Sequence, residues 1–166
     1  PVGGRPMLDR LLDRLGEMEG LDGVFVVTNA KFADAFREWA GQAGVDVQIV
    51  DDGTTDEETR LGAIGDLDLT IRQGGIEDDL LVLAGDNLFS ESLAGFPAFA
   101  LDKGGAALGV YDVGDFDAIR RYSAIELDGD DRVVRLEEKP SEPRTTLAGI
   151  ALYFYPRSTL RLVGEY

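Results

Sequence analysis

The stretch Leu80-Leu81-Val82-Leu83-Ala84-Gly85-Asp86-Asn87 decides the fold, because five consecutive apolar residues lead directly into a glycine and an acidic tip. A short apolar run that ends at a glycine is typical of a strand buried on both faces of a sheet. Such a strand delivers Asp86 to its C-terminal end, which is where α/β sheets bind their ligands. The loop after Ala84 is therefore the first place to look for a functional site.

Strand-like and helix-like patterns alternate on both sides of this stretch. Further strands are expected at residues 24–27, 45–50, 106–110 and 148–155, and helices at residues 6–18, 31–42, 60–72, 90–103 and 115–121. Pro97 is expected to kink or split the helix at 90–103. Residues 124–127 and 133–136 flank a turn-forming segment, which is typical of a hairpin. The alternation predicts an α/β fold with a parallel sheet covered on both faces and an antiparallel addition near the end.

The composition limits both the size and the chemistry of the protein. The chain has 166 residues, the size of one domain, and 44% of them are hydrophobic. It contains no cysteine and no histidine, which excludes disulfides, thiolate or histidine metal sites and a Ser-His-Asp triad. Catalysis must therefore rest on carboxylates, lysine, arginine, backbone amides and hard metal ions.

The net charge of −16 argues against nucleic acid as a partner, because binding it requires the neutralisation of phosphates. No apolar run approaches the roughly 20 residues that span a bilayer, and no signal peptide opens the chain. We therefore expect a cytoplasmic protein with no membrane partner, with further residues upstream because Pro1 is not a translation start. Aspartate-rich, lysine-poor composition favours a halophilic source, and a genome rich in G and C is the alternative explanation.

Asp86 is a candidate metal ligand. Mg²⁺ keeps most of its waters in proteins and is held by one or two carboxylates together with substrate phosphates. A carboxylate on the rigid tip of a buried strand suits that task. The alternative is that Asp86 and Asn87 only cap a turn before the next helix, as both residue types often do.

Glu138 and Lys139 form a second candidate site, in the segment Arg135-Leu136-Glu137-Glu138-Lys139-Pro140. A carboxylate accepts hydrogen bonds from sugar hydroxyls, and a lysine is a compact positive charge for a phosphate. The chain has only three lysines, and one of them lies here. The alternative is an ordinary surface ion pair at a strand terminus.

Three segments together resemble a known family. In order and spacing, PVGGRPMLDRLLDRL (residues 1–15), LLVLAGDNLF (80–89) and VVRLEEKPSEPRTTLAGIALYFYP (133–156) resemble the sugar-1-phosphate nucleotidyltransferases, the family of glucose-1-phosphate thymidylyl- and uridylyltransferases. Read alone, the glycines of the first segment match neither the Rossmann nor the Walker phosphate-binding pattern. The resemblance covers nearly the whole chain and implies a Rossmann-like, mixed, mostly parallel sheet flanked by helices.

The resemblance also implies a reaction, in which a sugar-1-phosphate attacks a nucleoside triphosphate and releases pyrophosphate. It implies that Asp86 binds Mg²⁺ and that Asp86 and Lys139 are catalytic, with Lys139 on the sugar phosphate. Glu138, Tyr122 and Gly149 would contact the sugar, although Ser123 stands where the family often has glycine. Gly62, within Leu61-Gly62-Ala63, resembles the base-recognition segment, but its usual glutamine partner is not evident. The sugar and the base therefore stay open, and family habit allows a homo-oligomer.

Two departures from the family are expected to matter. Family members begin with a buried strand and a glycine-rich loop that clamps the triphosphate, and a second metal-binding aspartate lies beyond the LYFY strand. We therefore expect residues 1–166 to be a single nucleotidyltransferase domain that lacks these parts and is inactive, or nearly so, without them. The rival interpretations are a non-catalytic homologue that binds nucleotide or sugar phosphate, a cytidylyltransferase for an alcohol phosphate, and a purely structural domain.

Overall fold

The structure is a computed structural model that describes residues 2–165, and its longest strand, β7 (Leu147–Tyr155), organises most of the sheet. β7 pairs antiparallel with β3 (Leu80–Leu83) and β4 (Ala107–Asp112), and with β5 (Ser123–Leu127) further along. β5 pairs in turn with β6 (Val133–Glu138) to form the expected hairpin. The result is a five-stranded sheet in which β3, β4 and β5 run in one direction and β7 runs against them.

A second, smaller sheet lies beside the first. It consists of β1 (Val24–Thr28) and β2 (Val47–Asp51), which pair in parallel over five residues. Within residues 2–165, no hydrogen-bonded pairing joins β1 to β3. The α/β class and the helix-flanked mixed sheet are confirmed, but the expectation of one parallel sheet through these strands is wrong, because β3 pairs with the antiparallel β7.

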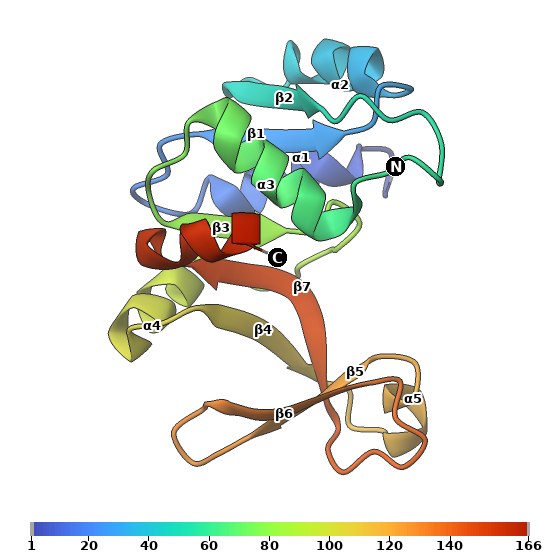
Figure 1. The fold of residues 1–166 in the computed structure, drawn as a ribbon, viewed down its shortest axis with the longest axis vertical. Helices are drawn as coiled ribbons and strands as arrows, with labels where there is room; N and C mark the ends of the chain where they lie inside the picture. Colours follow the sequence, from blue (N-terminus) through green and yellow to red (C-terminus); the bar gives the residue numbers. More distant parts are fainter. Residues whose placement is uncertain (1, 166) are drawn as a thin grey trace.

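Six helical segments cover the sheets (Figure 1): α1 (Met7–Leu15), α2 (Ala33–Ala40), α3 (Gly62–Gly74), α4 (Gly95–Lys103), α5 (Phe116–Ile119) and the 3₁₀ helix η1 (Arg157–Glu165). Figure 1 shows α3 and α1 on opposite faces of the region between β1 and β3. α3 packs against both β1 and η1, so it links the two sheets. None of the helices in the described residues is long and apolar enough to cross a membrane.

Burial in β3 differs from the expectation. Every residue of β3 is only half-buried, although its apolar run was expected to be buried on both faces, and every residue of β1 is half-buried as well. The reason is that β1 is paired on one edge only, and β3 likewise. At the start of α2, Phe32 is 48% exposed, whereas Ala33, the first residue of the helix, is buried.

Pro97 does not kink a helix. α4 begins only at Gly95, so Pro97 falls in the first turn, where a helix has no use for the missing N–H. The predicted start of this helix at residue 90 is therefore wrong, and its predicted end at Lys103 is confirmed. The core cluster lies elsewhere, where Ile119, which is 0% exposed, packs with Ala124 and Ala148.

Asp66, on α3, gives the stability of the fold a pH dependence. Burial raises the pKa of this carboxyl group above its ordinary value, and the neighbouring carboxylate of Asp52 raises it further. Its Oδ1 atom is buried and has no hydrogen-bond partner in residues 2–165. The folded protein therefore holds this proton more tightly than the unfolded chain. The resulting stabilisation is present below the ordinary aspartate pKa and is lost as the pH rises through the raised one.

We predict that Asp66→Asn raises the melting temperature at pH 7 by about 1–3 °C, because it removes a partly buried negative charge that solvent screens incompletely. The gain should shrink as the pH falls, because the raised pKa lets Asp66 take up its proton before an ordinary aspartate does. Thermal unfolding followed by circular dichroism at pH 7 and at lower pH is the measurement. Asp68→Asn is the matched control, since it breaks the 2.7 Å ion pair with Arg72 on the same helix and should not stabilise. An unchanged or lower melting temperature for Asp66→Asn at pH 7 would contradict the account.

Candidate functional site

β7 brings two distant parts of the chain onto the same edge of the sheet. β4 occupies one edge of β7 along Leu147–Phe154, so β3 and β5 must both lie on the other edge. On that edge the backbone N–H of Ala84 donates to the carbonyl oxygen of Ala151 at 3.0 Å, and Ala124 pairs with Ala148. The C-terminal end of β3 and the N-terminal end of β5 therefore meet end to end, three residues of β7 apart.

Asp86 lies at the tip of a tight turn at the end of β3. The N–H of Asn87 donates to the carbonyl oxygen of Ala84 at 3.1 Å, which closes the turn, and Asn87 Nδ2 donates to Ala151 O at 3.4 Å. The Asp86 side chain is exposed and accepts no hydrogen bond from residues 2–165. No helix starts here, since the next one begins at Gly95. The turn-capping alternative therefore accounts for Asn87 better than for Asp86.

Asp86 suits a magnesium ion that is also bound by the phosphates of a ligand. No group of three or more acidic, histidine or cysteine residues within residues 2–165 is arranged to hold a metal. A single exposed carboxylate suits an ion that keeps its waters and completes its shell with substrate phosphates. The residues present thus fit a metal that arrives with a phosphorylated ligand, and they do not form a closed metal cage.

Glu138 is the last residue of β6 and is paired with Ser123, the first residue of β5, and Lys139 follows it. Lys139 Nζ lies 3.6 Å from Glu138 Oε1, and the two side chains are 67% and 60% exposed. Such an exposed pair contributes about 0–1 kcal/mol to stability, so both charges remain available to a ligand. The backbone of Lys139 is held at φ 46° while its N–H donates to Tyr122 O at 3.0 Å. This conformation is uncommon for a residue with a side chain and often marks functional sites.

The remaining predicted residues lie around the same edge. Tyr122 precedes β5 and is 49% exposed. Gly149 follows the Ala148 that pairs with β5, and a Cβ added to it would touch Ile125 at 3.4 Å and Leu108 at 3.6 Å. Gly62 starts α3 at φ 76°, and Figure 1 places this end of α3 at the same end of the fold as the C-terminal end of β3. The structure thus places Tyr122, Glu138 and Lys139 together at the start of the β5–β6 hairpin, next to Gly149 on β7. Asp86 follows the strand that ends on the same edge of β7, and Gly62 lies at the start of a separate helix.

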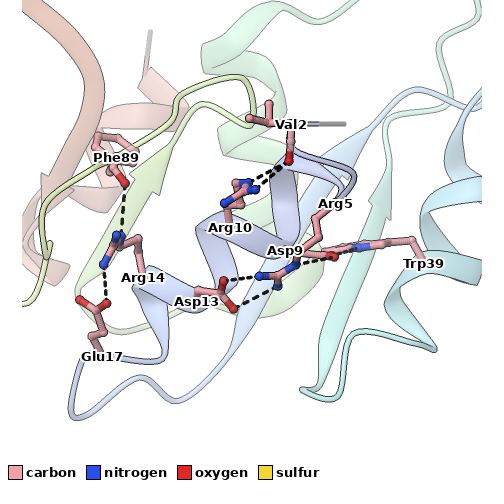
Figure 2. Close-up of polar contacts among 9 residues, drawn as sticks. All are labelled: Val2, Arg5, Asp9, Arg10, Asp13, Arg14, Glu17, Trp39 and Phe89. Atoms are coloured by element: carbon pink, nitrogen blue, oxygen red, sulfur yellow. Dashed lines mark hydrogen bonds and ion pairs between the residues drawn. The ribbon is translucent and has the colours of Figure 1, made fainter.

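The glycines near the start of the chain have a structural explanation. Gly3 and Gly4 have φ values of 58° and 82°, and the backbones of Val2 and Arg5 bond to each other across them. Arg10 closes the turn by donating to Val2 O at 2.8 Å and 3.1 Å (Figure 2). Two successive positive φ values require glycine in such a turn. Nothing in this geometry is needed to bind a phosphate.

Arg14 is a positioning residue that the sequence did not reveal. Its guanidinium donates to Phe89 O and to Ser90 O, both at 3.2 Å, and pairs with Glu17 Oε1 at 2.6 Å. Figure 2 shows this side chain reaching from α1 to the segment that follows the Asp86 turn. On its other side α1 is held by Trp39 Nε1, which donates to Asp9 Oδ1 at 2.7 Å. α1 therefore fixes the loop after β3 relative to α2.

We predict that Arg14→Gln increases amide hydrogen exchange in residues 85–92 by several-fold, because the loop loses its side-chain donor to two carbonyl groups. Exchange in β7 should not change. Arg37→Gln is the control, because Arg37 pairs at the surface with Asp34 at 2.7 Å and touches no part of this loop. Equal exchange in both variants would show that the loop holds its position without Arg14.

A mixed α/β sheet with an exposed carboxylate after one strand and an exposed Glu–Lys pair at the end of another offers charged groups to a phosphorylated ligand. The sequence model of the family described as Nucleotidyl transferase matches residues 1–165, and the chain belongs to this family. The sequence-based resemblance is thereby confirmed.

Individual relatives and solved structures agree with this assignment. The chain is 29% identical over its full length to a glucose-1-phosphate thymidylyltransferase of Mycolicibacterium smegmatis, and spans 58% of that protein. It is 20% identical over 99% of its length to the bifunctional protein GlmU of Methanocaldococcus jannaschii, and spans 36% of it. A Bacillus anthracis crystal structure described as a glucose-1-phosphate thymidylyltransferase in complex with sucrose superposes with a TM-score of 0.81, at 22% identity, over 99% of this chain and 64% of that one. Apo UDP-glucose pyrophosphorylase gives a TM-score of 0.75, at 14% identity, over 99% of this chain and 70% of that one. The chain thus spans about a third to somewhat over half of these curated relatives.

Proposed function

We propose that the full-length protein transfers a nucleotidyl group from a nucleoside triphosphate to a sugar-1-phosphate, giving a nucleotide-sugar and pyrophosphate. One observation carries the proposal: the strand that leads to the exposed Asp86 carboxylate and the strand whose start is paired with the exposed Glu138 meet along the same edge of β7. Membership of the nucleotidyl transferase family supports it.

In the proposed reaction an oxygen of the sugar phosphate attacks the α-phosphorus of the triphosphate. The bond from that phosphorus to the oxygen bridging to the β-phosphate breaks, and pyrophosphate leaves with the electron pair. The attacking phosphate is already ionised, so the step needs positioning and charge neutralisation rather than a general base. This explains how a chain with no histidine can serve the reaction.

Each site residue has one task in this proposal. Glu138 accepts hydrogen bonds from the sugar hydroxyls, Lys139 neutralises the sugar phosphate, and Tyr122 and Gly149 line the sugar site. Asp86 holds Mg²⁺, which supplies neutralisation of phosphate charge when it is bound. The start of α3 at Gly62 faces the nucleotide base. We further propose that the domain works in the cytoplasm, and that the acidic composition of the chain is an adaptation to high salt.

We predict that Asp86→Asn lowers pyrophosphate release by at least about a hundredfold in the full-length protein, because the amide cannot replace a charged metal ligand. Release would be followed with Mg²⁺ at high salt, crossing the common nucleoside triphosphates with glucose-, galactose-, mannose- and N-acetylglucosamine-1-phosphate. Asp102→Asn, at an exposed position on α4, is the matched control and should retain full activity. Full activity in Asp86→Asn would remove this residue from the site.

The second candidate is a non-catalytic homologue that binds nucleotide or sugar phosphate. Ser123 favours it, because a side chain stands where the family often has glycine at the sugar site. The same assay separates the two functions. A folded wild-type protein that binds a triphosphate by calorimetry but releases no pyrophosphate with any pair would establish the non-catalytic one.

We predict that Glu138→Gln raises the KM for the sugar-1-phosphate by about tenfold and leaves the KM for the triphosphate unchanged. The physical reason is that a charged acceptor makes stronger hydrogen bonds to hydroxyl groups than an amide does. Initial rates at varied concentrations of each substrate give both constants. Glu142→Gln, on the exposed segment that follows, is the control. A parallel rise in both constants would indicate general damage to the domain.

A further inference from the structure

Ser123 and Glu138 face each other in the ladder between β5 and β6, at the end of the hairpin nearest β7. The hydroxyl group of Ser123 donates a hydrogen bond to Oε2 of Glu138. The other carboxylate oxygen, Oε1, lies 3.6 Å from Lys139 Nζ. Ser123 therefore contacts the very carboxylate that the proposed function assigns to the sugar, and it does so from the opposing strand.

This hydrogen bond determines what Ser123 can offer to a ligand. A serine hydroxyl has one hydrogen and two lone pairs, and here the hydrogen is directed to Glu138. Its oxygen is left as an acceptor. The ionised carboxylate of Glu138 is also only an acceptor, with about four lone-pair positions, of which Ser123 takes one. The two side chains together present two adjacent acceptors and no free donor.

We propose that Ser123 determines sugar specificity, and that with Glu138 it binds two hydroxyl groups on neighbouring carbons of the sugar ring. The inference rests on the proposed function, since it concerns the same sugar site. Ser123 and Glu138 present their acceptor oxygens side by side because they are directly paired in the ladder, so two hydroxyl groups on neighbouring carbons are the sugar groups that can reach both at once. A ring that lacks one of these hydroxyl groups leaves an acceptor unpaired in the complex, which weakens binding.

Ser123 also holds Glu138 in place before the sugar arrives. The Glu138 side chain is 60% exposed, so without Ser123 only the Lys139 ammonium, 3.6 Å away, would restrain it. Ordering a free glutamate side chain costs up to about 2 kcal/mol of conformational entropy. The bond from Ser123 removes part of this cost from sugar binding. A glycine at this position would let the sugar approach the backbone closely. A serine prevents that approach and provides instead an ordered pair of hydrogen-bond acceptors.

The test uses the full-length protein and the sugar-1-phosphate that the wild type accepts best, together with its monodeoxy analogues. We expect Ser123→Ala to raise the KM for the sugar-1-phosphate about three- to tenfold, with the KM for the triphosphate and kcat unchanged. Ser123→Thr keeps the hydroxyl group on a residue suited to a strand and should restore the wild-type value. Ser158→Ala, on η1, is the control variant.

The deoxy analogues provide the sharper measurement. In the wild type, removal of one particular ring hydroxyl should weaken binding several-fold, and in Ser123→Ala that same removal should cost nothing further. Calorimetric binding of the sugar-1-phosphate gives the same comparison without turnover, and equal melting temperatures show that the variants fold.

The outcomes separate the inference from the proposed function. Two results would overturn the role of Ser123 and leave the proposed function standing. In the first, the wild type turns over and Ser123→Ala has the same kinetic constants. In the second, each deoxy analogue loses the same affinity in the wild type and in Ser123→Ala. Tighter sugar binding by Ser123→Ala would also overturn it, because Ser123 would then compete with the sugar. A third result would refute the reaction and retain the inference: the wild type releases no pyrophosphate with any substrate pair, while calorimetry shows weaker sugar-1-phosphate binding in Ser123→Ala.

Discussion

The backbone ladder along β7 is the constraint on which the rest of the structure depends. One strand pairs on both of its edges, with β4 on one side and with β3 and then β5 on the other. Hydrogen bonds between backbone groups fix register to a single residue, because a slip of one would turn every side chain to the opposite face. The spacing between Asp86 and the Glu138–Lys139 pair is therefore set by main-chain geometry, and the site side chains need no direct contact with each other.

Much of this fold was predictable from local patterns. Periodicity and turn chemistry act over a few residues, and they predict the strand before Asp86, the hairpin around residues 128–131 and the end of α4 at Lys103. The candidate residues around β7 came from a resemblance between segments. Their convergence on one edge is consistent with that resemblance, but the roles of these residues stay predictions.

The features that escaped prediction depend on contacts between distant residues. Nothing near Leu80 shows that its strand pairs with Tyr155 rather than with a parallel neighbour. Arg14 looks like one more charge on the polar side of a helix, and its partners Phe89 and Ser90 lie 75 and 76 residues away. The bond from Ser123 to Glu138 needed the register of the hairpin, which a turn signal alone locates only to within a residue or two. Local sequence encodes elements, whereas pairing and side-chain anchoring are decided by the whole chain.

The way the hairpin is attached has a mechanical consequence. β5 meets β7 through a single residue pair, Ala124 with Ala148, whereas β3 meets β7 through four pairs. The aspartate turn thus follows a strand that is paired with β7 along its whole length, whereas the Ser123–Glu138 pair lies on a two-stranded arm that shares one residue pair with β7 (Figure 1). Side chains also hold this arm at its base, because Ala124 packs with Ile119 and Ala148 in the core. The turn that carries Asp86 therefore depends on backbone pairing for its position, whereas the Ser123–Glu138 pair depends mainly on side-chain packing at the base of its hairpin.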